Sequence, residues 1–194
     1  MKQFSKEFNF DFVKENFILK DLISFIKKPS FSAFKCLLSE IFFYGFNSNR
    51  VRGSIKYRNI KIPFEIGTKL IKVREFTVPV TYFEFKNLPN GSFFQISNKD
   101  IFHNLESIFI KDIEFNLPEF DKKFLVLGKD PDFVKRIVTK QIIDLLLTLK
   151  KNIEITFENG TLIFQEERYI QDYQYFKNVM LINLLLLKNI FDGK

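Results

Sequence analysis

Residues 50–67, RVRGSIKYRNIKIPFEIG, indicate the fold class, because hydrophobic side chains recur in this run at every second position. They occupy positions 55 and 57 and then 60, 62, 64 and 66, whereas Lys56, Lys61 and Glu65 lie between them. The pattern predicts a β-hairpin that turns near Arg58, with one apolar face and one basic face. Pro63 lies on the polar phase and favours an edge position for the second strand, since proline lacks the backbone N–H.

Further strand patterns follow this hairpin. Residues 76–85 predict a third strand whose apolar phase shifts at Phe83 and Phe85, which suggests a β-bulge. A turn over 87–91 leads to a short strand at 92–96, and a short helix is expected from Asn98 or Asp100 to Phe109. A loop around Leu117 and Pro118 then precedes a strand at 123–127.

The C-terminal part carries the clearest local signals. Asp130 is a good N-cap and Pro131 suits the first helical position, so a long helix is predicted near 131–150. Residues 153–157 and 162–164 predict a second hairpin across Asn159-Gly160, a dipeptide typical of a type I′ turn. A last helix is predicted near 169–191, and its second half is apolar around most of its circumference.

The N-terminal residues 1–46 predict a pair of helices packed on the rest of the chain, because Phe12, Leu19, Ile23 and Ile26 form one stripe. Residues 47–194 form the α+β domain, and the two parts are expected to be one cooperative unit. The element order predicts an α+β fold with a mainly antiparallel sheet of about six to seven strands. The N-terminal helix pair, the helix near 131–150 and the helix near 169–191 would pack on this sheet.

Residues 45–167 resemble a prokaryotic family of uncharacterised α+β domains that are often found next to a membrane anchor. The resemblance rests on RVRGSIKYRNIKIPFEIG, on FDKKFLVLGKDPDFVKRIVTKQIIDLLLTL at 120–149, and on IEITFENGTLIF at 153–164. It implies a membrane-proximal position, and it assigns a catalytic role to no residue of this chain. This chain differs in its N-terminal helices, where Lys14, Glu15, Lys20 and Asp21 forbid a membrane-spanning segment.

The net charge of +7 is unevenly distributed along the chain. Residues 1–97 hold 16 Lys and Arg against 8 Asp and Glu, whereas residues 98–194 hold 14 against 15. The excess predicts a basic contact surface for a protein partner or an anionic membrane surface. The candidate binding residues are those of the 50–74 region: Arg50, Arg52, Lys56, Arg58, Lys61, Lys69, Lys72 and Arg74.

Two other interpretations of these basic residues compete with that of a contact surface. The same residues would also be explained as the solvated faces of strands in a lysine-rich chain. Binding of nucleic acid is less expected, because Lys outnumbers Arg 24 to 6 and Tyr57, Phe64 and Phe76 fall on the apolar phase.

The sequence contains few of the residue patterns that are typical of enzymes. Cys36 and His103 are single residues of their types, and the seven glycines stand too far apart to build a phosphate-binding loop. We therefore predict no cofactor, no metal site and no catalytic residue. The alternative is a Mg²⁺-dependent, nuclease-like enzyme that uses Glu84 and Lys86, with Glu65 or Glu75 as a second oxygen ligand.

Localisation is predicted from the apolar stretches. Residues 1–9 lack the apolar core of a signal peptide, and Val179–Leu187 is interrupted by Asn183 and falls short of the roughly 20 residues that span a bilayer. A single cysteine forms no internal disulfide. The sequence thus predicts a cytoplasmic protein. The alternative is a protein that binds peripherally to a membrane.

Overall fold

The computed structural model describes residues 50–57, 60–73, 76–99, 112–167, 170 and 172–193. Several predictions fall outside these residues: the helix pair in 1–46, the short helix that ends at Phe109, and the candidate residues Cys36, Arg58, Arg74, Glu75 and His103.

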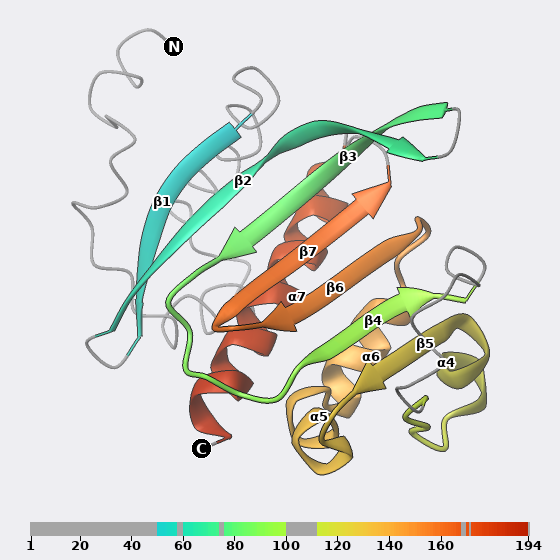
Figure 1. Cartoon of the computed structure of the whole chain (residues 1–194). Helices are drawn as coiled ribbons and strands as arrows, with labels where there is room; N and C mark the ends of the chain where they lie inside the picture. The colour runs from blue at the N-terminus through green and yellow to red at the C-terminus, as the bar shows by residue number, and fades with distance from the viewer. Residues whose placement is uncertain are drawn as a thin grey trace, which may run out of the picture.

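The described residues form a seven-stranded sheet with the strand order β1-β2-β3-β7-β6-β4-β5 (Figure 1). Every pair of neighbouring strands is antiparallel, so the predicted α+β fold with an antiparallel sheet is confirmed. The strands are β1 (Arg50–Tyr57), β2 (Ile60–Val73), β3 (Phe76–Phe85), β4 (Phe94–Asn98), β5 (Phe124–Gly128), β6 (Ile153–Glu158) and β7 (Thr161–Glu167).

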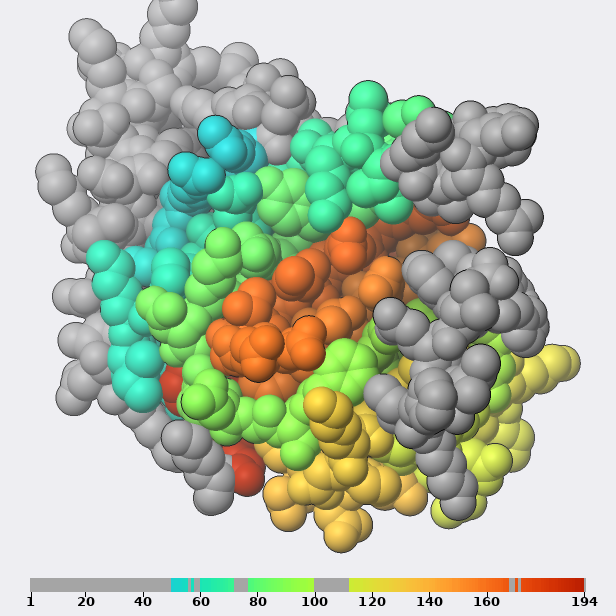
Figure 2. Space-filling model, in the orientation of Figure 1, coloured from blue at the N-terminus to red at the C-terminus, as the bar shows by residue number. Residues whose placement is uncertain are grey.

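Helices α5 (Pro131–Ile137), α6 (Lys140–Leu147) and α7 (Tyr173–Asp192) lie on one side of the sheet, while the short α4 (Pro118–Lys123) precedes β5 (Figure 1). We call the other side, which is turned away from α5, α6 and α7, the open face. Figure 2 views the molecule from this side, with β6 and β7 near its centre.

The core lies between the sheet and these helices. Burial alternates along β6 and β7, as the period of two predicts, and Ile155 and Phe164 are fully buried. The largest fully buried side chains are mostly phenylalanines: Phe83, Phe85, Phe94, Phe120, Phe124, Phe157, Phe164 and Phe176. Many of the 27 phenylalanines therefore supply apolar area to the core.

The predicted hairpin at 153–164 and the predicted helix start at Asp130 are both confirmed. Asn159 and Gly160 have φ values of 49° and 70°, as a type I′ turn requires. Asp130 caps α5 by accepting a hydrogen bond from the N–H of Phe133 at 3.0 Å. The last helix begins slightly later than predicted, at Tyr173, where Asp172 accepts from the N–H of Tyr175.

The prediction of one long helix near 131–150 is wrong. Val138 and Thr139 leave the helical conformation, with ψ values of 78° and 163°, and separate α5 from α6. Ile137 and Ile142 are both fully buried although they stand five positions apart. In a straight helix this spacing turns side chains to different faces, so the break lets both contact the core.

The prediction that the strand with Pro63 lies at the sheet edge is also wrong, because β2 pairs with both β1 and β3. Pro63 lies opposite Ser54, and its carbonyl accepts from the N–H of Lys86 at 3.0 Å. The missing N–H of Pro63 thus falls just beyond Phe85, the last residue of β3. No hydrogen bond within the β2–β3 ladder is lost.

The predicted bulge in the third strand is not found, since β2 and β3 pair without interruption from Phe64 and Phe85 to Val73 and Phe76. The apolar phase shifts because β3 has hydrophobic residues on both faces. Phe83 packs toward the helices, against Phe176 of α7, whereas Tyr82 belongs to the open face. The loop expected around Leu117 and Pro118 is likewise corrected, because α4 begins at Pro118.

The part of the chain that the structure describes contains no helix that is both long and apolar enough to cross a membrane.

Candidate functional site

The β1–β2 register gathers four of the eight candidate basic residues on the open face. Arg52 lies opposite Glu65, and alternate residues of a strand point to opposite sides, so Arg50, Lys61 and Lys69 share the side of Arg52. All four cationic residues are exposed. Lys56 pairs with Lys61 in the register, and Lys72 lies near the end of β2. The side chains of these last two lie outside the described atoms, as Arg58 and Arg74 do.

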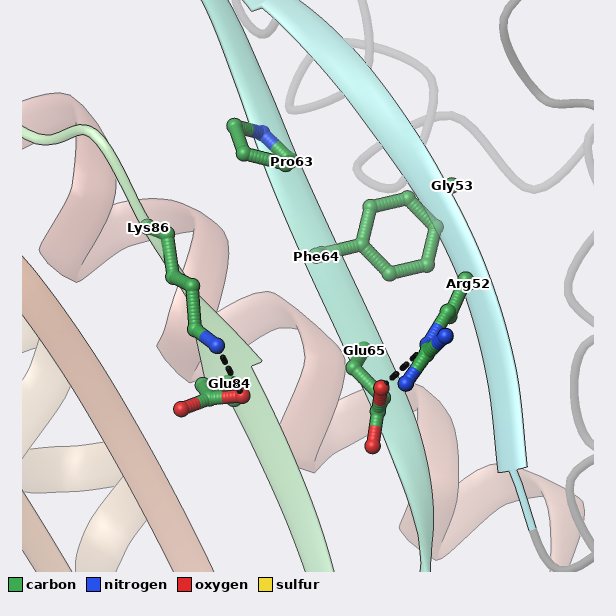
Figure 3. Close-up of a pocket in the computed structure, with 7 residues that line it drawn as sticks. All are labelled: Arg52, Gly53, Pro63, Phe64, Glu65, Glu84 and Lys86. Carbon is green, nitrogen blue, oxygen red and sulfur yellow. Dashed lines mark hydrogen bonds and ion pairs between the residues drawn. The ribbon is translucent and has the colours of Figure 1, made fainter.

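Glu65 accepts hydrogen bonds from two residues of this face. Its carboxylate accepts a hydrogen bond from Nε of Arg52 at 2.5 Å and a second one from the hydroxyl of Tyr82 (Figure 3). A second ion pair joins Lys86 Nζ to Glu84 at 3.1 Å. Glu65 and Glu84 are direct neighbours across β2 and β3, so the two pairs lie side by side.

The hydrogen bonds fix the protonation states of Glu65 and Tyr82. Partial burial raises the pKa of Glu65, but the bonds from Tyr82 and Arg52 outweigh it, and the pKa lies below its ordinary value. Burial and the bond to Glu65 raise the pKa of Tyr82 to about 12. At neutral pH Glu65 is therefore ionised, and Tyr82 remains a hydrogen-bond donor to it.

A hollow of about 220 Å³ lies beside these pairs (Figure 3). Pro63 has a short side chain between the longer charged ones, and Ser54 opposite it is buried. The surface of the sheet is therefore recessed at Pro63 and Ser54. The residues that line the hollow are Arg52, Gly53, Pro63, Phe64, Glu65, Glu84 and Lys86.

Tyr82 is the residue that sequence reasoning missed. Besides its bond to Glu65, its ring lies under Nζ of Lys69, 5.3 Å from the ring centre. Tyr57 and Phe64 are buried, as their apolar phase predicts, whereas Tyr82 places an aromatic ring among the cations of the open face. The position of Tyr82 in the strand could have indicated this: Tyr82 and Glu84 stand two positions apart, so their side chains must lie on the same face of the sheet.

The arrangement required by a metal-dependent nuclease is only partly present. Glu65 and Glu84 both line the hollow with Lys86, but their carboxylates turn to different cations (Figure 3). Across the described ranges, no group of three His, Cys, Asp or Glu side chains is placed to hold a metal ion. What the described side chains can do is attract a charged group and orient it against fixed donors.

Comparison with known proteins assigns no family to this chain, because no family model matches it and no curated protein matches it. Among solved structures, it is similar to the crystal structure of the mycobacterial trehalose monomycolate transport factor A, TtfA. The two are 8% identical, with a TM-score of 0.38, over 66% of this chain and 72% of that chain. Similarity of this degree supports no transfer of function.

Proposed function

We propose that this chain is a non-enzymatic interaction domain that binds a protein partner through the basic part of its open face. The observation that carries the proposal is the gathering of exposed cations on one face of adjacent strands. Arg50, Arg52, Lys61 and Lys69 come from β1 and β2, and Lys86 follows β3 directly. A surface of this kind steers an acidic partner toward it and sets its orientation.

The mixed signs of charge favour a protein over a membrane as the partner. Glu65 and Glu84 stand between Arg52 and Lys86, so a uniformly anionic lipid surface would meet two carboxylates at the centre of its contact. A protein surface can offer both signs in a complementary pattern. An anionic membrane surface is the alternative that the experiment below separates.

Charge changes sign across the open face, which also favours a partner with a defined orientation. In the register, Glu154 and Glu158 of β6 lie on the same side of the sheet as Glu84, and Glu158 is exposed. The face is thus basic on β1 and β2 and acidic on β6. A partner that binds across it would be aligned by both halves, because like charges placed opposite each other cost several kcal/mol.

The experiment compares two double charge reversals that change the net charge equally. Lys61→Glu with Lys69→Glu alters the basic surface, whereas Lys135→Glu with Arg136→Glu alters two exposed residues of α5. The probes are a fluorescein-labelled acidic peptide, vesicles of phosphatidylcholine with phosphatidylglycerol, and a short DNA duplex. Binding is followed by anisotropy or co-sedimentation between about 50 and 300 mM NaCl, where screening changes strongly.

We expect the first variant to weaken peptide binding about tenfold and the α5 variant to stay within about threefold, with affinity falling as salt rises. An equal loss in both variants, or no peptide binding by the unmodified chain at low salt, would overturn the proposal. Binding to the vesicles or the DNA without binding to the peptide would also overturn it, and would assign the surface to that partner class.

A further inference from the structure

We propose that the hollow between Arg52 and Lys86 is a carboxylate-binding pocket, which receives an acidic side chain from an extended segment of the protein partner. The inference rests on the proposed function, and it names the group that the partner brings to the surface. Arg52 is the main binding residue, Lys86 is the second cation, and Glu65 and Tyr82 act as positioning residues.

Arg52 is held in place while its outer donors stay available. Its Nε donates to Glu65 at 2.5 Å, its side chain is 65% exposed, and its two terminal amino groups have no partner among the described residues. Glu65 is itself fixed by the hydroxyl of Tyr82. A guanidinium held by Nε can offer two parallel N–H groups to the two oxygens of a carboxylate. Because the group is fixed beforehand, less side-chain entropy is lost on binding.

Lys86 supplies the second positive charge across the hollow. Its side chain is 56% exposed, and its ammonium group pairs with Glu84 at 3.1 Å. Arg52, Glu65 and Glu84 lie directly opposite one another on β1, β2 and β3. Neighbouring strands are about 4.8 Å apart, so the two flanking strands stand about 10 Å from each other, within reach of two long cationic side chains. An acidic segment that crosses the strands here meets a cation on each side.

Size and charge favour a single carboxylate over larger or more highly charged ligands. The volume of about 220 Å³ is below the roughly 300 to 1,000 Å³ of small-molecule sites, so the hollow suits one functional group. Its two cations balance Glu65 and Glu84, and the exposed Arg50, which acts on Glu65 from the same face, supplies further positive charge that attracts an anion. A phosphate dianion would bring a second negative charge beside Glu84, whereas a carboxylate brings one.

The test uses the full chain and three flexible Gly-Ser peptides that carry glutamate, glutamine or phosphoserine at matched positions. Arg52→Gln and Lys61→Gln each remove one positive charge from the basic surface, but only Arg52 lines the hollow. We expect Arg52→Gln to weaken binding of the glutamate peptide about tenfold, as loss of a charged hydrogen-bond pair does, and to abolish its preference over the glutamine peptide. Lys61→Gln should weaken both peptides about twofold and leave the preference unchanged.

Two further variants test the geometry rather than the charge. Arg52→Lys keeps the charge but loses the paired donors, so we expect it to regain only part of the affinity. Tyr82→Phe removes one bond to Glu65, and we expect it to lower the glutamate preference severalfold while circular dichroism shows the native fold. Full rescue by Arg52→Lys would contradict the paired-donor geometry.

The possible outcomes distinguish a carboxylate-binding pocket from a basic contact surface without such a pocket. Equal losses in Arg52→Gln and Lys61→Gln, with glutamate still preferred, would overturn the pocket and leave the basic contact surface standing. Tighter binding of the phosphoserine peptide would overturn the carboxylate assignment. If the unmodified chain binds none of the peptides, the proposed function itself fails. Should Arg52→Gln not fold, the peptide preference of Arg52→Lys decides.

Discussion

Gly160 shows how much depends on one residue in the β6–β7 turn. Its φ of 70° is in the left-handed region, and its carbonyl accepts from the N–H of Leu88 at 2.9 Å. A Cβ atom at this position would lie 2.7 Å from the carbonyl oxygen of Leu88. Both the conformation and the close approach therefore favour glycine.

We predict that Gly160→Val lowers the free energy of unfolding by about 2 kcal/mol or more, because a β-branched residue adds backbone strain and a steric clash. Urea unfolding measures the change. Asn159→Gly, at the neighbouring turn position with φ of 49°, serves as the control and should stay within about 0.5 kcal/mol. A loss for Gly160→Val no larger than that of the control would contradict the turn geometry.

Glu166 is a second single residue on which the stability of the fold depends. It faces the helix layer of the sheet with 2% of its surface exposed, and its Oε2 has no hydrogen-bond partner among the described residues. Burial raises the pKa of Glu166 to about 7. Its charged form is therefore costly in the folded state.

The raised pKa predicts a falling stability between about pH 4.5 and pH 7. In this range the unfolded chain ionises Glu166 while the folded chain keeps it protonated, so ionisation favours unfolding. At about 1.36 kcal/mol per unit the loss amounts to roughly 3 kcal/mol and levels off above pH 7. Glu166→Gln should remove this slope and raise stability at pH 8. Urea midpoints at several pH values measure it, and parallel profiles for the two proteins would contradict the prediction.

At the scale of elements, a side chain of α7 contacts the break between α5 and α6. Where α5 ends, the carbonyl of Ile137 accepts two hydrogen bonds, one from Nδ2 of Asn189 at 2.8 Å and one from the N–H of Thr139 at 3.2 Å. Asn189 thus connects α7 to the position where two short helices replace one long helix.

We expect Asn189→Ala to destabilise the protein by about 1 kcal/mol, because the carbonyl of Ile137 loses the shorter of its two hydrogen bonds. Asn178→Ala removes an amide from the same helix whose recorded hydrogen bond is an exposed one from Gln174, and should cost less than about 0.5 kcal/mol. Thermal or urea unfolding of both variants distinguishes them. Equal values would mean that the Ile137 contact contributes nothing.

These elements also show what a sequence can predict. The 153–164 hairpin and the start of α5 were predicted because Asn159-Gly160 and Asp130 act on their own neighbours in the chain. The helix break, the central place of β2 and the absence of a bulge involve contacts with distant residues such as Asn189 and Phe85. Local pattern carries no information about those contacts.

The candidate site divides in the same way. Alternation over residues 55–66 was enough to predict that Lys61 lies on the polar face of the hairpin. Arg52 and Lys69 were candidates because of their charge alone, as was Lys72, which stands three positions from Lys69 and has the opposite phase in β2. The bond from Tyr82 to Glu65 and the pairing of Glu65 with Glu84 require the register between β2 and β3, which no pattern within either strand contains.

At the scale of the molecule, the sheet is not equally supported along its strands. β3 pairs with β7 only over Thr81–Phe85, so among the described strands residues 76–80 pair with β2 alone. Leu70, in the matching part of β2, is 67% exposed. By contrast, β6 and β7 have partners on both sides and contribute several fully buried side chains.

Native-state hydrogen exchange should reflect this difference, because the most protected amides are those with the most buried surroundings. We predict the slowest exchange in β6 and β7, and exchange faster by at least about tenfold over residues 68–73 and 76–80. Mass spectrometry of peptic fragments measures both regions in one experiment. Uniform protection across the sheet would contradict the prediction.

The strand order bears on how the chain is synthesised. The hairpin of β6 and β7 joins β3 to β4, yet it leaves the ribosome after both of them. Because translation adds roughly 5 to 20 residues per second, β7 is synthesised on the order of ten seconds after β3. During this interval its edge can pair with other nascent chains, so molecular chaperones have a long window in which to protect it. Slowing translation after residue 85 should therefore increase aggregation of the nascent chain, and speeding it should improve the yield of folded protein.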